Sequence, residues 1–287
     1  MSSERDDRDV VSGWDEGISG TVVRNGRLVH VEHIWSTVIS ITVPDVADRQ
    51  SAAVVAIGEC VRFFEKVDVS FSAFRPLSEV SLYRMGLSGP GGHTPEFEEV
   101  MVACRRLRND TRGAFDPWCV PGGYDPSGYV KGWAAGRASE ILSAAGFGDH
   151  LVNAGGDISA RGDEVRASAR GWPVGILNPH EPTEVIAVVD LRDEAMATSG
   201  RYERGDHVID PSTGEAAVSV DSATVVGPDA GMADAIASAV LVHGLDSMAW
   251  FPELGADWSM HLVIDERAHS YGEAFDARLV QRGEGDA

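Results

Sequence analysis

Hydrophobic and polar residues alternate along much of the chain, and this two-residue period predicts β-strands. Residues 20–44 are rich in Val and Ile and break at Arg24-Asn25-Gly26, where the Asn-Gly pair is typical of hairpin turns. We therefore expect two antiparallel strands in this segment. Further strand-like patterns occur at residues 67–72, 149–161, 172–178, 184–192, 259–265 and 274–281, and residues 196–222 mix loop and strand.

A 3.6-residue period of apolar positions predicts helices in four segments. These are residues 48–66, a segment that begins at Thr94, residues 131–145 and residues 230–243. Thr94 can act as an N-cap and Pro95 suits the first helical position, while Gly146 is a typical helix stop. Hairpins outnumber β-α-β units in this order of elements, which predicts an α+β fold with largely antiparallel sheets and helices packed on them.

Composition agrees with a globular chain, because 43% of the 287 residues are hydrophobic and 24% are charged. We expect residues 1–15 to form a disordered tail and residues 16–282 a single domain. The net charge of −21 argues against a nucleic-acid partner, so an anionic ligand would need a divalent cation, backbone N–H groups or a helix N-terminus. The chain begins without an apolar signal segment and has no run of ~18 apolar residues, which predicts a soluble cytoplasmic protein without membrane insertion.

Two segments combine glycine with aspartate in positions that a core does not require. Residues 113–117 are Gly-Ala-Phe-Asp-Pro, in which Pro117 keeps Asp116 extended and leaves its carboxylate free to point away. An Asp-Pro turn with Phe115 in the core is the alternative. Residues 153–158, Asn-Ala-Gly-Gly-Asp-Ile, place two glycines inside a strand pattern, which indicates close approach of a ligand or another backbone, or a simple bulge.

Two helices carry polar groups of a kind that could bind a ligand. Asp125, Gly128 and Lys131 stand at a helix start, which suits an anionic or metal-bridged ligand, although Asp125 could equally be a cap. Asp234 and Ser238 lie four residues apart on one face of an apolar helix, where a carboxylate has to be paired or metal-bound. Oxygen ligands favour Mg²⁺ over zinc. In the alternative, Ser238 bonds to its own helix and Asp234 is exposed near the helix N-terminus.

His207 begins the segment His-Val-Ile-Asp-Pro-Ser-Thr-Gly and follows Ala-Thr-Ser-Gly at residues 197–200. Because an imidazole titrates near neutral pH, His207 could act as the general base for a hydroxyl nucleophile. A structural histidine beside a turn is the alternative. The chain has no GxSxG elbow, no GxGxxG and no Walker A motif, so a Ser-His-Asp hydrolase, a Rossmann site and a P-loop are not expected.

Taken in order, these segments resemble the FAD:protein FMN transferase family, also called the ApbE family. The resemblance covers about residues 30–243 and is carried by motifs at residues 71–81, 113–117, 125–132, 153–157, 197–200, 207–214 and 233–239. It implies a duplicated, T-fold-like architecture. It also implies a Mg²⁺-dependent transfer of FMN from FAD to a Thr or Ser hydroxyl of an acceptor protein, with release of AMP. Hydrolysis of FAD to FMN and AMP, or FAD binding without turnover, are the alternatives.

The resemblance assigns roles to single residues. Those implied to bind FAD are Trp35, Ser78, Ala114, Phe115, Asp116, Asp125 and Lys131. Those implied to bind Mg²⁺ are Gly128 through its carbonyl and Asp234 and Ser238 through their side chains, and His207 is the implied base. Two positions depart from the family: Trp35 replaces the usual Met, where its ring could stack on the flavin or adenine or crowd it out, and Ser238 replaces the usual Thr but keeps the hydroxyl.

Overall fold

The computed structural model describes residues 19–88, 91–165, 171–200, 208–217 and 220–276. The tail expected at residues 1–15 lies outside these ranges, and so do both predicted limits of the domain, residues 16 and 282. Within the described ranges, no helix combines the length and the apolar character that crossing a bilayer requires.

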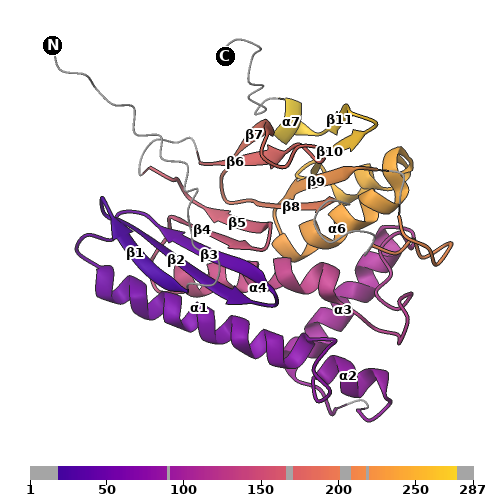
Figure 1. Cartoon of the computed structure of the whole chain (residues 1–287), viewed down its shortest axis with the longest axis horizontal. Helices are drawn as coiled ribbons and strands as arrows, with labels where there is room; N and C mark the ends of the chain where they lie inside the picture. The colour runs from indigo at the N-terminus through magenta and orange to yellow at the C-terminus, as the bar shows by residue number, and fades with distance from the viewer. Residues whose placement is uncertain (1–18, 89–90, 166–170, 201–207, 218–219, 277–287) are drawn as a thin grey trace.

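A nine-stranded sheet runs through the described part of the chain, and every neighbouring pair of its strands is antiparallel (Figure 1). Its strand order is β1-β2-β3-β4-β5-β8-β9-β10-β11. The strands are β1 (Gly20–Arg24), β2 (Arg27–Ile34), β3 (Thr37–Val43), β4 (His150–Ala154), β5 (Asp157–Arg161), β8 (Ala195–Gly200), β9 (Ser222–Gly227), β10 (Ser259–Ile264) and β11 (Arg267–Tyr271). A separate antiparallel pair consists of β6 (Trp172–Leu177) and β7 (Val185–Leu191).

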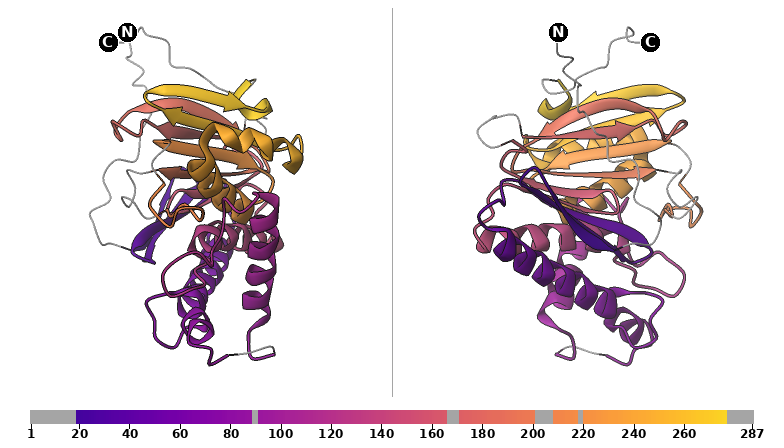
Figure 2. Two further views of the ribbon diagram at one scale, coloured as in Figure 1. Left: turned by 90° about the vertical axis from the view of Figure 1, so that its right-hand side faces the viewer. Right: turned by 60° about the vertical axis from the view of Figure 1, so that its left-hand side comes forward.

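The helices differ widely in length and in the strands that they cover. They are α1 (Gln50–Phe71), α2 (Glu79–Arg84), α3 (Pro95–Asp110), α4 (Ser127–Ala144), α6 (Ala230–His243) and α7 (Glu273–Asp276), with the 3₁₀ turns η1 (Gly244–Ala249) and η2 (Phe251–Leu254). Helix α4 packs on β4 and β5, and α6 packs on β8 and β9. Figure 2 shows α2 at the end of the molecule farthest from β10 and β11. The structure thus confirms the predicted mixture of helices and antiparallel sheet, while the duplicated T-fold stays a prediction.

The central strands of the large sheet are buried on both faces. Ala195 and Ala197 of β8 belong to the main core together with residues of α6, whereas Met196 between them packs in a second cluster with Trp172 of β6 and Val189 of β7. Alternate residues of a strand face opposite sides of the sheet, so this split places helices on one face and the β6–β7 pair on the other. Neither face of β8 or β9 is therefore left to solvent.

Helices α4 and α6 cross with their backbones in contact. A Cβ added to Gly132 would lie 2.0 Å from the carbonyl oxygen of Ala230, and one added to Gly231 would lie 2.8 Å from the Tyr129 ring. Only glycine fits at such distances, because real Cβ atoms do not approach other heavy atoms below 3.0 Å. The crossing brings the first turns of α4 against the face of α6 that carries Asp234.

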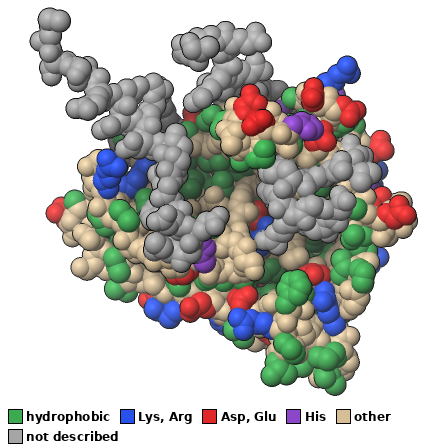
Figure 3. Space-filling model, in the orientation of Figure 1, with side chains coloured by type: hydrophobic (Ala, Val, Ile, Leu, Met, Phe, Trp, Pro, Cys, Tyr) green, Lys and Arg blue, Asp and Glu red, His purple; other side chains and the backbone are tan. Residues whose placement is uncertain are grey.

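Exposed apolar side chains gather around α2. Figure 3 shows green side chains at the lower right of the molecule, where Figure 1 places this helix. Phe74 and Leu77 precede α2 and are 96% and 83% exposed, and Met85 and Leu87 follow it and are 54% and 70% exposed. Elsewhere on this face, acidic and basic side chains are interspersed (Figure 3).

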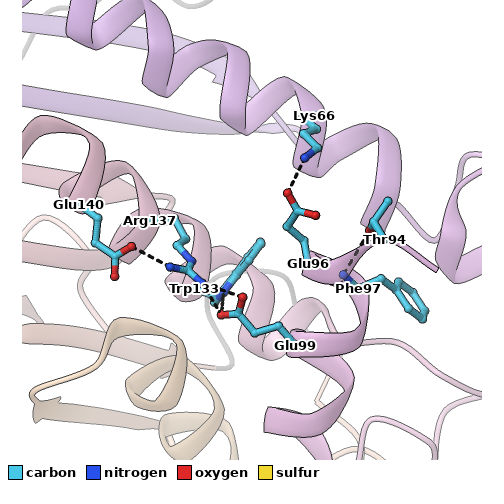
Figure 4. A network of polar contacts seen from close by, with 8 residues as sticks. All are labelled: Lys66, Thr94, Glu96, Phe97, Glu99, Trp133, Arg137 and Glu140. Carbon is cyan, nitrogen blue, oxygen red and sulfur yellow. Dashed lines mark hydrogen bonds and ion pairs between the residues drawn. The ribbon is translucent and has the colours of Figure 1, made fainter. Parts of the chain in front are cut away.

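Polar contacts tie α3 to α1 and α4 (Figure 4). Glu99 of α3 accepts a hydrogen bond from Trp133 Nε1 at 2.9 Å and pairs with Arg137 of α4 at 2.6 Å. Lys66 near the end of α1 pairs with Glu96 of α3 at 2.5 Å. These side chains are partly exposed, so each contact contributes modestly, about 0.2–1 kcal/mol for an exposed pair.

The predicted strand at residues 67–72 is wrong, because these residues are the last turns of α1 and the cap that follows them. Val67 and Phe71 lie four residues apart and are both buried, whereas Val69 between them is 56% exposed. The short pattern Val-Asp-Val-Ser-Phe is compatible with both the two-residue period of a strand and the 3.6-residue period of a helix. Packing of α1 against α4 favours the helix.

Three other predicted elements also differ. Residues 20–44 hold three strands rather than two, because a second turn occurs at Trp35 and Ser36, with φ angles of 61° and 57°. Residues 79–84, for which the sequence predicted no helix, form α2, and Ser78 caps it by accepting a hydrogen bond from Ser81 N at 3.0 Å. Residues 274–276 were expected in a strand but belong to α7.

The strongest local signals in the sequence are confirmed. The hairpin at Asn25 and Gly26 joins β1 to β2, and both residues have the positive φ that such turns require. Thr94 is the N-cap of α3 and accepts a hydrogen bond from Phe97 N at 3.3 Å. Predicted helix 230–243 coincides with α6.

Candidate functional site

A cavity of about 180 Å³ lies where the start of α4 meets α6. Its walls come from six parts of the chain: the loop at residues 114–120, the start of α4 with Asp125 before it, the β4–β5 turn at Gly155, the end of β8, residues 208–209 and the face of α6. Eight residues with predicted roles line it, namely Ala114, Phe115, Asp116, Asp125, Gly128, Lys131, Asp234 and Ser238. The fold therefore brings together residues that are up to 124 positions apart in the sequence.

Lys131 extends from α4 into the cavity between two buried carboxylates. Its Nζ lies 2.5 Å from Asp157 Oδ2 and 3.9 Å from Asp234 Oδ1. The side chains of Asp157 and Asp234 are 2% and 5% exposed, and that of Lys131 is 22% exposed. Buried carboxylates are costly without a partner, so the ammonium group stabilises both.

The predicted metal ligands Gly128, Asp234 and Ser238 lie side by side. Ser238 Oγ is 3.1 Å from Ser199 Oγ of β8, and a Cβ added to Gly128 would lie 3.5 Å from Ser238 Oγ. Asp234 Oδ2 accepts a hydrogen bond from Gly132 N at 3.4 Å. The α4 backbone departs from helical geometry at Gly128, where φ is −80° and ψ is 15°.

The chemistry of these ligands fits Mg²⁺. A carboxylate, a hydroxyl and a carbonyl supply only oxygen donors, which hard cations prefer. Within the described residues, no group of three or more His, Cys, Asp or Glu side chains could form a metal cage. Mg²⁺ does not require such a cage, because it commonly binds through one or two carboxylates and completes its shell with substrate phosphates and water.

Asp116 and Asp125 line the cavity and are also anchored to the protein. Asp116 pairs with Arg108 at 2.8 Å and accepts a hydrogen bond from Trp118 N at 2.9 Å. Asp125 accepts from Ser127 N at 3.0 Å, at the first residue of α4, and its other oxygen lies 3.2 Å from Arg84 Nη2. The turn at Asp116 and the cap-like bond of Asp125 are thus both present, and both carboxylates remain at the cavity wall.

Two predicted site residues lie away from the cavity, and the position of a third is not described. Trp35 lies in the β2–β3 turn with its ring edge-on to Phe64 at 5.5 Å between centroids, and it does not line the cavity. Ser78 is 1% exposed and caps α2. His207 lies outside the described residues, although its sequence neighbours Val208 and Ile209 line the cavity.

Several residues at the site had no role in the sequence-based prediction. Asp157 and Ser199 lie inside motifs that the sequence singled out, so the signal existed but did not distinguish them from their neighbours. Arg84 and Arg108 come from α2 and α3, and no sequence pattern connects them with Asp125 and Asp116. Only the tertiary fold reveals these two arginines as anchors.

Cys119 also lines the cavity, as a free thiol. Burial raises the pKa of this thiol above its usual range, and the nearby Asp116 carboxylate adds to the rise. Because the thiolate is the nucleophilic form, Cys119 is a poor nucleophile at neutral pH.

Comparison with known proteins points to one family. A sequence model of the ApbE family matches residues 123–257, which include α4, the Lys131–Asp157 pair and α6. The chain is 35% identical over 149 residues to a FAD:protein FMN transferase from Rhodobacter capsulatus and 37% identical over 179 residues to one from Treponema pallidum. These matches cover 49% and 54% of this chain, but only 27% and 49% of the relatives, so the chain spans less than half the length of either.

Solved structures with the same fold carry the same family name. The flavin transferase ApbE from Vibrio cholerae matches with a TM-score of 0.74 and 21% identity, over 88% of this chain and 99% of that one. The ApbE protein from Thermotoga maritima matches with a TM-score of 0.73 and 22% identity, over 90% and 98% of the two chains. Motifs, family model, relatives and fold agree, which confirms the resemblance of this chain to the ApbE family.

Proposed function

We propose that this chain is a Mg²⁺-dependent FAD:protein FMN transferase, which moves FMN from FAD to a Thr or Ser hydroxyl of an acceptor protein and releases AMP. One observation carries the proposal: eight residues predicted to bind FAD or Mg²⁺, from separate segments of the chain, line a single cavity. The names of the relatives, FAD:protein FMN transferase, agree with it.

In this proposal, FAD binds against the loop at residues 114–116 and the start of α4. The pyrophosphate of FAD is anionic, and the protein has a net charge of −21, so the site needs local positive charge. Lys131 places an ammonium group at the cavity wall, where it is paired with Asp157, and bound Mg²⁺ would add the remaining positive charge. Phe115 is buried beneath Gly128 and offers an apolar contact.

Asp234, Ser238 and the carbonyl of Gly128 would hold Mg²⁺. When bound, the cation would neutralise the negative charge that develops on the departing AMP phosphate. Asp234 is buried at the α4–α6 crossing, so its carboxylate has a fixed position before any ligand arrives.

His207 is the proposed general base. It would accept the proton of the acceptor hydroxyl as the oxygen forms a bond to the FMN phosphorus and the bond from that phosphorus to the AMP oxygen breaks. The proposal is supported by Val208 and Ile209, which directly follow His207 in the sequence and line the cavity.

The direct test is to incubate the protein with FAD, Mg²⁺ and a panel of flavin-acceptor domains, and to measure acceptor mass. We expect acceptor that gains one FMN, release of AMP, and loss of both in Asp234→Asn. Free FMN and AMP without an adduct on any acceptor would instead identify an FAD hydrolase. Intact FAD under all conditions would identify a binding protein without turnover.

A further inference from the structure

Asp157 holds the cationic end of Lys131 at one side of the cavity. The two side chains come from different layers, since Lys131 lies on α4 and Asp157 is the first residue of β5. Their charged atoms are 2.5 Å apart, whereas the second carboxylate beside Lys131, that of Asp234, is 3.9 Å away. Coulomb attraction falls with distance, so of these two carboxylates Asp157 attracts the ammonium group more strongly.

The backbone that carries Asp157 is well supported. Asp157 pairs with Ala154 across the β4–β5 hairpin, whose turn is formed by Gly155 and Gly156 with φ angles of 67° and 103°. A Cβ added to Gly155 would lie 2.6 Å from Thr37 Oγ1, so the turn packs directly on β3. A carboxylate on such a rigid element can fix the position of its partner.

Asp234 is needed elsewhere if the proposed function holds, because it is the one carboxylate among the proposed Mg²⁺ ligands. An ammonium group in direct contact with Asp234 would compete with the cation for the same oxygens. Lys131 Nζ lies 3.9 Å from Asp234 Oδ1, and a small rotation of the flexible lysine side chain would bring the two groups into direct contact.

We propose that Asp157 is a positioning residue that holds Lys131 away from Asp234 and so limits competition between the ammonium group and the cation for this carboxylate. The inference rests on the proposed metal site. It gives Asp157 a role in metal binding, which the burial of its side chain alone does not explain. Without Asp157, Lys131 turns to Asp234, and more Mg²⁺ is needed to displace it.

The test is a Mg²⁺ titration of Asp157→Asn, a variant that keeps the side-chain size and removes the charge. Binding of Mg²⁺ alone is followed by calorimetry, and Mg²⁺-dependent binding of FAD by quenching of flavin fluorescence. We expect the half-saturating Mg²⁺ concentration to rise about tenfold, which is the effect of a 1.4 kcal/mol competition. Asp163→Asn is the matched control: Asp163 is also buried and lies just beyond β5, but it does not line the cavity, so the titration should not change.

A second substitution separates positioning from structural damage. In the double variant Asp157→Asn/Lys131→Met the competing ammonium group is gone, so the Mg²⁺ requirement should return towards that of the unmodified protein, although FAD binds more weakly without the lysine. A double variant that needs as much Mg²⁺ as Asp157→Asn would overturn the proposal. If Asp157→Asn fails to fold, as judged by near-UV circular dichroism, Lys131→Met alone decides, because the proposal predicts no increase in its Mg²⁺ requirement.

These outcomes are distinct from those that test the function. FMN transfer by the unmodified protein together with an unchanged titration in Asp157→Asn keeps the function and rejects the role of Asp157. Mg²⁺ binding that shifts as predicted in Asp157→Asn, without FMN transfer by the unmodified protein, supports the role of Asp157 and rejects the transferase function. An unmodified protein that binds neither Mg²⁺ nor FAD rejects both.

Discussion

Ser238 shows how a single hydroxyl connects two elements at the cavity. Its Oγ lies 3.1 Å from Ser199 Oγ, which joins α6 to β8, and it faces Gly128 of α4. In the proposed site it is also a Mg²⁺ ligand. The hydroxyl therefore has two roles, one in packing and one in binding, and substitutions can separate them.

We predict that Ser238→Ala weakens Mg²⁺-dependent FAD binding by about tenfold or more, since a bond to a charged group contributes about 1.5–3 kcal/mol. Ser238→Thr keeps the hydroxyl and should bind nearly as well as the unmodified protein. Flavin fluorescence at varied Mg²⁺ concentration measures both. Equal binding by the alanine and threonine variants would show that Ser238 is only a packing residue.

At the residue scale, sequence motifs predicted most of the cavity wall. Asp116, Asp125 and Lys131 lie in Gly- and Asp-containing segments at a turn and a helix start, and Asp234 is a carboxylate on the face of an apolar helix; a core requires none of these groups, and all four line the cavity. The motifs failed where a role depends on a distant partner. Trp35 is an example, because its ring packs on Phe64 of α1, and nothing near it in the sequence indicates that contact.

At the scale of elements, the site depends on how closely α4 and α6 approach. Gly132 and Gly136 lie one turn apart on α4, but only the first meets a backbone: a Cβ on Gly132 would be 2.0 Å from Ala230 O, and one on Gly136 would be 3.9 Å from Ala230 Cβ. The Gly132 position also lies 3.0 Å from Asp234 Cβ. Separating the helices would therefore displace Asp234.

The two glycines form a matched pair for testing this crossing. We predict that Gly132→Ala lowers the free energy of unfolding by about 1–3 kcal/mol through overpacking and raises the Mg²⁺ requirement as well. Gly136→Ala should be neutral or stabilising by up to about 1 kcal/mol, because alanine favours helix and has room. Urea unfolding measures the stability of both variants. Equal stability of Gly132→Ala and Gly136→Ala would show that the α4–α6 crossing is not tightly packed at Gly132.

Elements were predicted best where a local signal was strong. The Asn-Gly turn and the Thr94 cap are set by backbone requirements of a few neighbouring residues, and the structure confirms them. The end of α1 was mispredicted because a five-residue alternation does not distinguish a strand from a helix, and the deciding contact, with α4, is remote in sequence. Tertiary packing overrides short patterns of this kind.

At the scale of the whole molecule, His150 joins the helical layer to the sheet and is completely buried. Its Nδ1–H donates to the carbonyl of Phe147 at 2.8 Å, since a carbonyl can only accept, and its Nε2 accepts from Ser139 of α4 at 2.7 Å. Burial lowers the pKa of His150 from 6.5 to about 4. The imidazole is therefore neutral in the folded protein throughout the range from neutral pH to about pH 5.

This burial predicts a loss of stability in mild acid. A His pKa that is lower in the folded state means that the unfolded chain binds more protons between about pH 4 and 6.5, so stability falls as pH falls through this window. His150 contributes about 2 kcal/mol of destabilisation by pH 5, within a limit of about 3 kcal/mol set by the pKa difference.

Urea unfolding of the unmodified protein and of His150→Gln at pH 7.5 and pH 5 isolates this contribution, because glutamine does not titrate. The variant should be less stable at pH 7.5, where it loses the native contacts, and should lose less stability on acidification. Parallel losses in the two proteins would assign the acid sensitivity to other groups, such as the buried ion pairs at the cavity.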